Sequence, residues 1–174
     1  NSVTPLYPGL GSSARKIDHC ERLYGRAGLR TVFRLPSLAG DAAALDARLE
    51  ARGYGNADAT EVLRRPLAAE DFRRDGRVRR VGRDVWLRLY AHLTEQPVDA
   101  NRLHALIVGA IPTTCFFLAA YADERPVACG LGVLDGELVG LFDVVTAPTH
   151  RRQGYAEAVV IDALARGAED GARV

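Results

Sequence analysis

Hydrophobic positions recur every three or four residues in five segments of the chain, and this spacing predicts amphipathic helices. Shorter apolar runs bounded by turn residues predict strands. We expect helices over residues 14–26, 41–53, 86–93, 103–111 and 155–167, and strands over 31–35, 60–63, 114–121, 126–134 and 138–145. The turn sequences between the last three strands are typical of hairpins. The second half of the chain therefore predicts an antiparallel meander placed between helices.

These elements fall into two groups, which predicts two lobes. The first lobe is expected to cover residues 1–67 and the second 85–174, with a linker over 68–84. The linker contains six arginines interleaved with three aspartates, and Phe72 is its one aromatic residue. Because the aspartates neutralise part of the arginine charge, the segment is better explained as a solvated strand or hinge than as a nucleic-acid surface. The apolar helical stripes that follow, one through Trp86 and one through Leu103, are expected to lie in the core.

Composition argues against several classes of partner. The 174 residues include 23 Lys and Arg against 22 Asp and Glu, a net charge of +1, so no global field attracts nucleic acid or an anionic membrane. No signal peptide is recognisable, and every apolar run is far shorter than the ~20 residues that span a bilayer. We therefore expect a soluble, cytoplasmic protein. The cysteines and the helix histidines lack metal-ligand spacing, so we expect no metal and structural roles for Cys20, Cys115, Cys129, His19, His92 and His104.

The most informative segment joins the strand at 138–145 to the helix at 155–167. Pro148 marks a turn, and Gly154 stands where the helix begins. The first N–H groups of a helix lack carbonyl partners and lie at the positive end of its dipole, so they bind phosphate oxygens. Gly154 lets the backbone approach an anion, and Arg151 and Arg152 can add charge-assisted hydrogen bonds. The segment predicts a diphosphate site; an ordinary strand-to-helix crossover with an exposed arginine pair is the alternative.

The pattern Pro148-x-x-Arg151-Arg-Gln-Gly154-Tyr-Ala156 resembles the acetyl-CoA signature of the GNAT superfamily of N-acetyltransferases. The order of elements over 85–174 also resembles that family. The resemblance implies an α/β fold of the α+β type, in which a mixed, mainly antiparallel sheet is flanked by helices. The first lobe resembles the later half of the same fold more faintly. It is either a smaller, degenerate copy or a chance likeness.

The resemblance also implies the roles of individual residues. Main-chain groups of Val144, Val145 and Thr146 would bond the pantetheine arm of acetyl-CoA. Backbone N–H groups would bond its diphosphate from Arg151, Arg152, Gln153, Gly154, Tyr155 and Ala156. The family's next strand, and a last helix that often presents a tyrosine as general acid, have no counterpart before Val174. We therefore expect the natural chain to continue.

Transfer of an acetyl group to an amine needs a base, and Asp143 is the candidate. A carboxylate inside an otherwise apolar strand is costly unless it has a function or a partner. The alternative is that Asp143 pairs with an arginine or a backbone amide. Glu137 is a weaker candidate, because the turn should expose it. His150 could touch phosphate or be solvated, and Cys129 could be acylated or simply act as a small buried hydrophobe.

These observations favour an acyl-CoA-dependent N-acyltransferase. It would move an acetyl group from acetyl-CoA, as co-substrate, to a primary amine of a small molecule or protein. The alternative is a catalytically inactive CoA-binding module with a regulatory or interaction role, and a third option is nucleotide binding at the same turn. We expect no nucleic-acid and no membrane partner. The acceptor, the preferred acyl chain and the oligomeric state are open, with a homodimer as one option.

Overall fold

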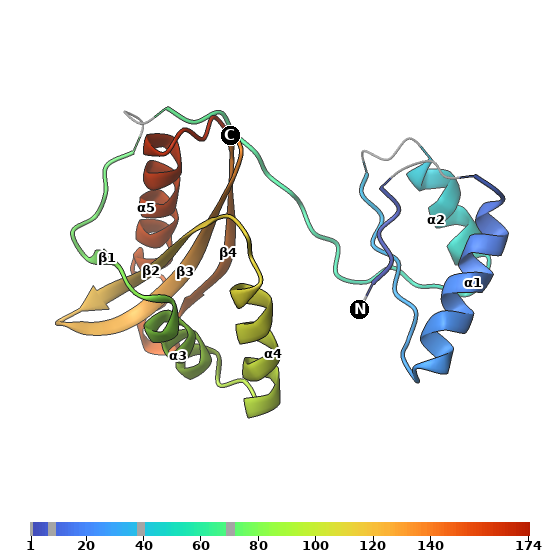
Figure 1. Ribbon diagram of the computed structural model, residues 1–174, viewed down its shortest axis with the longest axis horizontal. Coiled ribbons are helices and arrows are strands. Elements are labelled where there is room, and N and C mark those ends of the chain that lie inside the picture. The colour runs from blue at the N-terminus through green and yellow to red at the C-terminus, as the bar shows by residue number, and fades with distance from the viewer. Residues whose placement is uncertain (1, 7–9, 38–40, 69–71) are drawn as a thin grey trace. The chain divides into compact units, whose positions relative to one another are not determined.

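The chain forms two compact units, Asn1–Glu61 and Val62–Val174 (Figure 1). The computed structural model describes residues 2–6, 10–37, 41–68 and 72–174. Within these ranges, no helix has both the length and the apolar character that a membrane crossing requires. Each unit is described by itself below.

The first unit is built on two helices, α1 (Ser13–Arg26) and α2 (Ala42–Glu50). The hydroxyl of Ser12 accepts a hydrogen bond from the N–H of Arg15 at 3.4 Å, so it caps the start of α1 as expected for a serine at this position. One aliphatic side chain of each helix is buried, Ile17 and Leu49. Two helices with one buried anchor each make a small core. The faint likeness of this lobe to the later half of the GNAT fold stays a prediction.

Two strands expected near this unit are wrong. Residues 31–35 make only an isolated parallel bridge between Val3 and Phe33. Residues 60–63 form no strand, and Val62 and Leu63 are 93% and 86% exposed. Apolar and β-branched residues form a stable strand only where a neighbouring strand completes the hydrogen-bond ladder. Neither segment has such a neighbour among the described residues.

The second unit is a four-stranded antiparallel sheet between helices (Figure 1). The strands lie in chain order: β1 (Val78–Arg80), β2 (Thr114–Ala122), β3 (Arg125–Asp135) and β4 (Leu138–Thr146). Helices α3 (Arg83–Thr94) and α4 (Val98–Gly109) lie on one face, and α5 (Tyr155–Glu169) lies on the other. The meander predicted between 114 and 145 is confirmed, and so is the mixed α/β fold with flanking helices.

Each face of the sheet packs its own hydrophobic layer, and β3 contributes to both. Cys129 and Leu131 lie in the layer with Trp86 of α3. Gly130, between them, faces α5: a Cβ added there would lie 2.6 Å from Cγ1 of Val159. The absence of a side chain at this position therefore lets α5 approach the sheet closely.

Helix α4 buries a different stripe from the one expected. Leu103, Leu106 and Ile107 are 60%, 64% and 59% exposed, so their predicted place in the core is wrong. Val108 is 4% exposed and packs in the layer of Trp86. His104, four residues earlier, lies on the same side of the helix because residues i and i+4 share a face. The inward face of α4 is thus the one that carries the histidine.

Strand β1 lies within the arginine-rich segment 68–84 and joins the edge of the sheet. Arginines in and beside β1 pair with acidic side chains. Nη2 of Arg79 lies 2.7 Å from Oε1 of Glu124, and Nη2 of Arg77 lies 2.6 Å from Oδ2 of Asp75. These exposed ion pairs balance part of the basic charge locally.

Candidate active site

Strand β4 contains a bulge near its centre. Along the β3–β4 pair, β3 advances by two residues from Leu131 to Cys129, whereas β4 advances by three from Phe142 to Val145. Asp143 has a φ of 53°, in the left-handed region, which aspartate enters more readily than most residues do. One extra residue of β4 is therefore accommodated at Asp143.

The bulge decides which face of the sheet Asp143 occupies. Val139 packs in the layer beneath α5, whereas Val145 packs in the layer beneath α3. The two valines are six residues apart, and in a regular strand with a period of two they would face the same side. Without the bulge, Asp143 would share the α5 face with Val139. The extra residue turns its carboxylate toward α4 instead.

On that side Asp143 meets His104. Oδ2 of Asp143 lies 2.8 Å from Nε2 of His104, and the two side chains are 25% and 18% exposed. The ring of Tyr90 stacks on the imidazole with centroids 4.4 Å apart, and the indole of Trp86 stacks on Tyr90 at 5.3 Å. A half-buried acid–base pair therefore lies against an aromatic column.

The sequence interpretation missed this pairing. His104 was expected to be structural because it has no partner at metal-ligand spacing, yet the fold supplies Asp143 from 39 residues away. The available signal was a histidine sharing a helix face with Val108, a buried residue of α4. The described residues bring together no group of three or more His, Cys, Asp and Glu side chains that could hold a metal.

Two other titratable groups lie close to Asp143 and are shifted toward their protonated forms. Burial raises the pKa of the Tyr90 hydroxyl, and the negative charge of Asp143 raises it further. Burial, and then the same charge, raises the pKa of the Cys129 thiol to about 12. Neither group therefore loses its proton near neutral pH.

We expect Cys129 to resist alkylation in the folded protein. With a pKa of about 12, only about one thiol in ten thousand is ionised at pH 8, and the residue is 0% exposed. Native labelling with iodoacetamide, read by mass spectrometry, should modify Cys129 only after denaturation. The half-buried Cys20 is an internal comparison. Rapid native labelling of Cys129 would contradict this expectation and support an acyl-cysteine role.

The turn after β4 presents a row of backbone N–H groups without acceptors. A 3-10 turn (Pro148–His150) follows β4, and the N–H of Arg151 donates to the Pro148 carbonyl at 3.4 Å. The N–H groups from Arg152 to Glu157 have no acceptor among the described residues. Arg152 and Gly154 have φ values of 61° and 82°, and left-handed residues of this kind can curve successive amides around an anion. We call these N–H groups the amide row.

Side chains of the predicted diphosphate site hold this turn together. Nε of Arg151 donates to the Thr146 carbonyl at 3.3 Å, and Nε2 of Gln153 donates to the Thr149 carbonyl at 3.1 Å. Arg152 is exposed. The predicted residues Tyr155 and Ala156 open α5 and contribute N–H groups to the amide row.

The outer edge of β4 points away from β3. The N–H of Ala147 donates to Val127 of β3 at 2.8 Å, whereas the carbonyl of Thr146 accepts from Arg151 on the opposite side. Because backbone groups alternate in direction along a strand, the N–H groups of Thr146 and Val144 lie on the outer edge. The backbone of Val145 faces β3.

The two ends of this edge differ: backbone groups at its start are paired, whereas, in the described structure, a side-chain hydroxyl at its end is not. Among the described residues, Arg173 and Val174 pair with the edge at its start, where Val139 donates to Val174 at 2.8 Å and Arg173 donates to Glu137 at 2.7 Å. The hydroxyl Oγ1 of Thr146 is buried and has no hydrogen-bond partner in the described part of the chain. A polar atom of this kind is available to a ligand at the end of β4.

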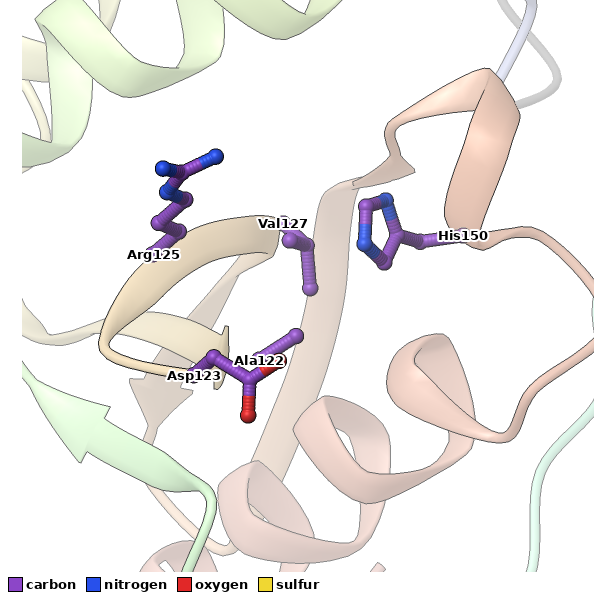
Figure 2. Close-up of a pocket in the computed structure, with 5 residues that line it drawn as sticks. All are labelled: Ala122, Asp123, Arg125, Val127 and His150. Atoms are coloured by element: carbon purple, nitrogen blue, oxygen red, sulfur yellow. The ribbon is translucent and has the colours of Figure 1, made fainter.

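A hollow lies beside the turn (Figure 2). Its volume is about 410 Å³, and it is lined by Ala122, Asp123, Arg125, Val127 and His150. Asp123 comes from the β2–β3 turn and Arg125 from the start of β3, and the imidazole of His150 points toward Val127. The hollow adjoins the segment that carries the amide row, because His150 precedes that row by two residues.

Comparison with known proteins places this arrangement in a family. The sequence model of the Acetyltransferase (GNAT) family matches residues 78–174, more than half of the chain. Among solved structures, the chain is similar to the "Putative acetyltransferase from Agrobacterium tumefaciens str. C58", with 25% identity and a TM-score of 0.39, covering 53% of this chain and 74% of that chain. No curated protein matches this chain. Because the family match spans the whole sheet, its helices and the turn before α5, this chain belongs to the GNAT acetyltransferase family.

Proposed function

We propose that this protein is an acyl-CoA-dependent N-acyltransferase that moves an acetyl group from acetyl-CoA to a primary amine of a small molecule or protein. Membership of the GNAT acetyltransferase family supports acyl transfer in general. The observation that carries the finer proposal is the amide row from Arg152 to Glu157, which lacks acceptors among the described residues. When bound, acetyl-CoA supplies an activated thioester, and residues of this chain bind it and move the proton.

The amide row fits a diphosphate for reasons of charge and geometry. Its N–H groups lie at the start of α5, the positive end of a helix of 15 residues. Left-handed conformations at Arg152 and Gly154 favour a concave arrangement of donors. The guanidinium groups of Arg151 and Arg152 add positive charge beside it. A diphosphate offers the several acceptor oxygens that such a donor set requires.

The outer edge of β4 fits the amide-containing pantetheine arm. The edge N–H groups of Val144 and Thr146 are available to an extended chain, which can pair with a strand edge as another strand would. Val145, whose backbone faces β3, would line the site through its side chain. An arm that runs from the amide row along this edge reaches the bulge at Asp143. The proposal therefore brings the thioester close to the His104–Asp143 pair.

Proximity at the bulge would supply much of the acceleration, and the rest needs a base. The amine must be neutral to attack. The Asp143 carboxylate takes up its proton directly or through the imidazole that it contacts. The nitrogen then bonds to the carbonyl carbon, the C–S bond breaks, and the second proton goes to the departing sulfur.

In this proposal the second lobe, residues 85–174, follows the linker 68–84 and binds both substrates. The first lobe, residues 1–67, is a structural copy without a cofactor site. Its R-x-x-G-x-A strings, at 22–27 and 52–57, lie at or beyond the ends of α1 and α2 and open no described helix. A cytoplasmic location, the absence of a nucleic-acid partner and a homodimer stay predictions from the sequence.

Calorimetry with acetyl-CoA tests the proposal. We expect saturable binding with a Kd below about 1 mM, in the range usual for enzyme substrates. S-acetylpantetheine, which lacks the diphosphate and the nucleotide, should bind about 100-fold more weakly, because two lost charge-assisted hydrogen bonds cost about 3 kcal/mol. No binding at millimolar acetyl-CoA would contradict the proposal.

Two further outcomes separate this function from its alternatives. Binding of acetyl-CoA without CoA release over a panel of primary amines would indicate a catalytically inactive CoA-binding module. Tighter binding of ATP than of acetyl-CoA would indicate a nucleotide site at the same turn. Release of CoA that depends on an added amine supports acyl transfer.

A further inference from the structure

We propose that His104 and Asp143 form a dyad in which Nδ1 of His104 removes the proton from the acceptor amine and Asp143 positions the imidazole. This inference rests on the proposed acyl transfer and names the group that performs its proton step. His104 would touch the substrate. Asp143 acts through His104 and is therefore a positioning residue.

The contact between the two side chains determines which nitrogen can act as the base. Nε2 of His104 lies 2.8 Å from Oδ2 of Asp143. An ionised carboxylate only accepts hydrogen bonds, so Nε2 must carry the proton that it donates. In the neutral ring, Nδ1 then holds the lone pair. Nδ1 has no hydrogen-bond partner among the described residues. It is also not fully buried, so a substrate can reach it.

The aromatic column holds the imidazole in place. Tyr90 of α3 stacks on His104 at 4.4 Å between centroids. The column is tied to the sheet by Trp86, whose Nε1 donates to the Gly130 carbonyl at 3.0 Å in a buried hydrogen bond. A ring held by a stack on one side and a hydrogen bond at Nε2 has little freedom to rotate, which suits a group that must meet a substrate in one orientation.

Several titratable side chains lie near His104, and among Tyr90, Cys129 and Asp143 only Asp143 is charged. Tyr90 faces the His104–Asp143 pair from α3 and Cys129 from β3, and for both groups burial raises the pKa and keeps the side chain neutral at pH 7. Asp143 comes from β4. Its negative charge stabilises the imidazolium that forms when Nδ1 takes up a proton.

The position of the dyad matches the place where the thioester is expected. Asp143 is the bulge residue, and Val144, the next residue, has its N–H on the outer edge of β4. An amine that reaches this point from the α3 and α4 side approaches His104 before it approaches the strand. Oδ2 of the carboxylate is engaged by the imidazole, and the proposal assigns the amine to Nδ1 on the other side of the ring.

A primary ammonium gives one proton to Nδ1 of neutral His104, which becomes imidazolium and later releases this proton to solvent. The neutral amine forms a bond to the thioester carbonyl carbon as the C–S bond breaks. The second nitrogen proton goes to the departing sulfur, and the products are an N-substituted acetamide and CoA thiol. The expected acceptors are therefore primary alkylamines, which are cationic at neutral pH and attracted by the Asp143 charge.

The test compares three variants of the full chain in an assay of CoA release with primary alkylamines. In His104→Gln, the amide Nε2 can still donate to Asp143, but no nitrogen accepts a proton. We expect kcat to fall about 10²–10⁴-fold, with acetyl-CoA affinity in calorimetry unchanged. His92→Gln is the matched control, because it makes the same change at an exposed histidine of α3 and should leave kcat unchanged.

The pH profile of kcat/KM distinguishes the dyad from direct catalysis by Asp143. We expect the ascending limb of the wild type to disappear in His104→Gln. In Asp143→Asn the limb should persist with a reduced rate, because the imidazole remains but has lost the carboxylate that orients it. If His104→Gln keeps the limb while Asp143→Asn loses it, Asp143 is the base and the dyad is overturned.

Remaining outcomes separate this inference from the proposed function. If the wild type does not bind acetyl-CoA, the proposed function fails and the dyad with it. If acetyl-CoA binds and CoA is released equally by wild type and His104→Gln, only the dyad fails. Binding without release for every amine also overturns the dyad. Nitrogen-15 NMR of the histidines gives an independent reading: the Nε2–H tautomer is expected at His104, and the Nδ1–H tautomer contradicts the proposal.

Discussion

Replacing Gly154 with valine is expected to weaken acetyl-CoA binding about 100-fold or more. Gly154 has a φ of 82°, and a β-branched residue in this region is strained by about 1–3 kcal/mol. A Cβ at this position meets no atom within 4 Å, so the effect arises from backbone conformation and not from a steric clash. Relief of the strain would turn N–H groups of the amide row away from the diphosphate. Calorimetry with acetyl-CoA measures the loss.

Two variants show whether the loss belongs to the amide row. Gly154→Asn should retain much of the affinity, because asparagine tolerates the left-handed region. Gly136→Val introduces the same kind of strain in the β3–β4 turn, where φ is 57° and a Cβ also meets no atom within 4 Å. It should lower stability without changing acetyl-CoA affinity. Wild-type affinity in Gly154→Val would show that the amide row does not bind the diphosphate.

Replacing Trp86 with alanine is expected to lower the free energy of unfolding by about 3–5 kcal/mol. Trp86 is 0% exposed and fills the layer between α3 and the sheet. Its removal leaves a cavity and also strips the Gly130 carbonyl of its 3.0 Å hydrogen bond. Urea denaturation followed by circular dichroism measures the change.

Trp86→Phe separates packing from hydrogen bonding. Phenylalanine refills most of the volume but removes the side-chain donor to the Gly130 carbonyl, so we expect a loss of about 1–3 kcal/mol. Leu106→Ala, at a residue that is 64% exposed on α4, should change stability by no more than about 0.5 kcal/mol. If Trp86→Ala cost no more than Leu106→Ala, the aromatic column would not be part of the core.

The outcome of each expected strand depended on its neighbours. The strands β2, β3 and β4 follow one another through tight turns, so turn chemistry and apolar runs predicted them together. The segments 31–35 and 60–63 have similar residues but no adjacent strand in the described structure. Local composition indicates how readily a segment forms a strand. The strand that completes its hydrogen-bond ladder lies elsewhere in the chain.

Helix α4 shows the same limit for a helix. Its apolar residues marked a stripe through Leu103, Leu106 and Ile107, and that stripe is exposed. The face that packs on the sheet includes His104 and Val108. Periodicity predicts that a helix forms, but which of its faces is buried depends on how the helix docks.

The sequence by itself determined the antiparallel meander, helix α5 and the turn whose N–H groups lie between them. Each of these depends on residues that are close along the chain: alternation, helical spacing, and a glycine that accepts a left-handed conformation. Only the tertiary structure decided that Asp143 lies beside His104. A single extra residue in β4 reverses the direction of the side chain at the bulge, because strand side chains alternate with a period of two. The pairing then depends on the docking of α4 onto that face, which no local pattern records.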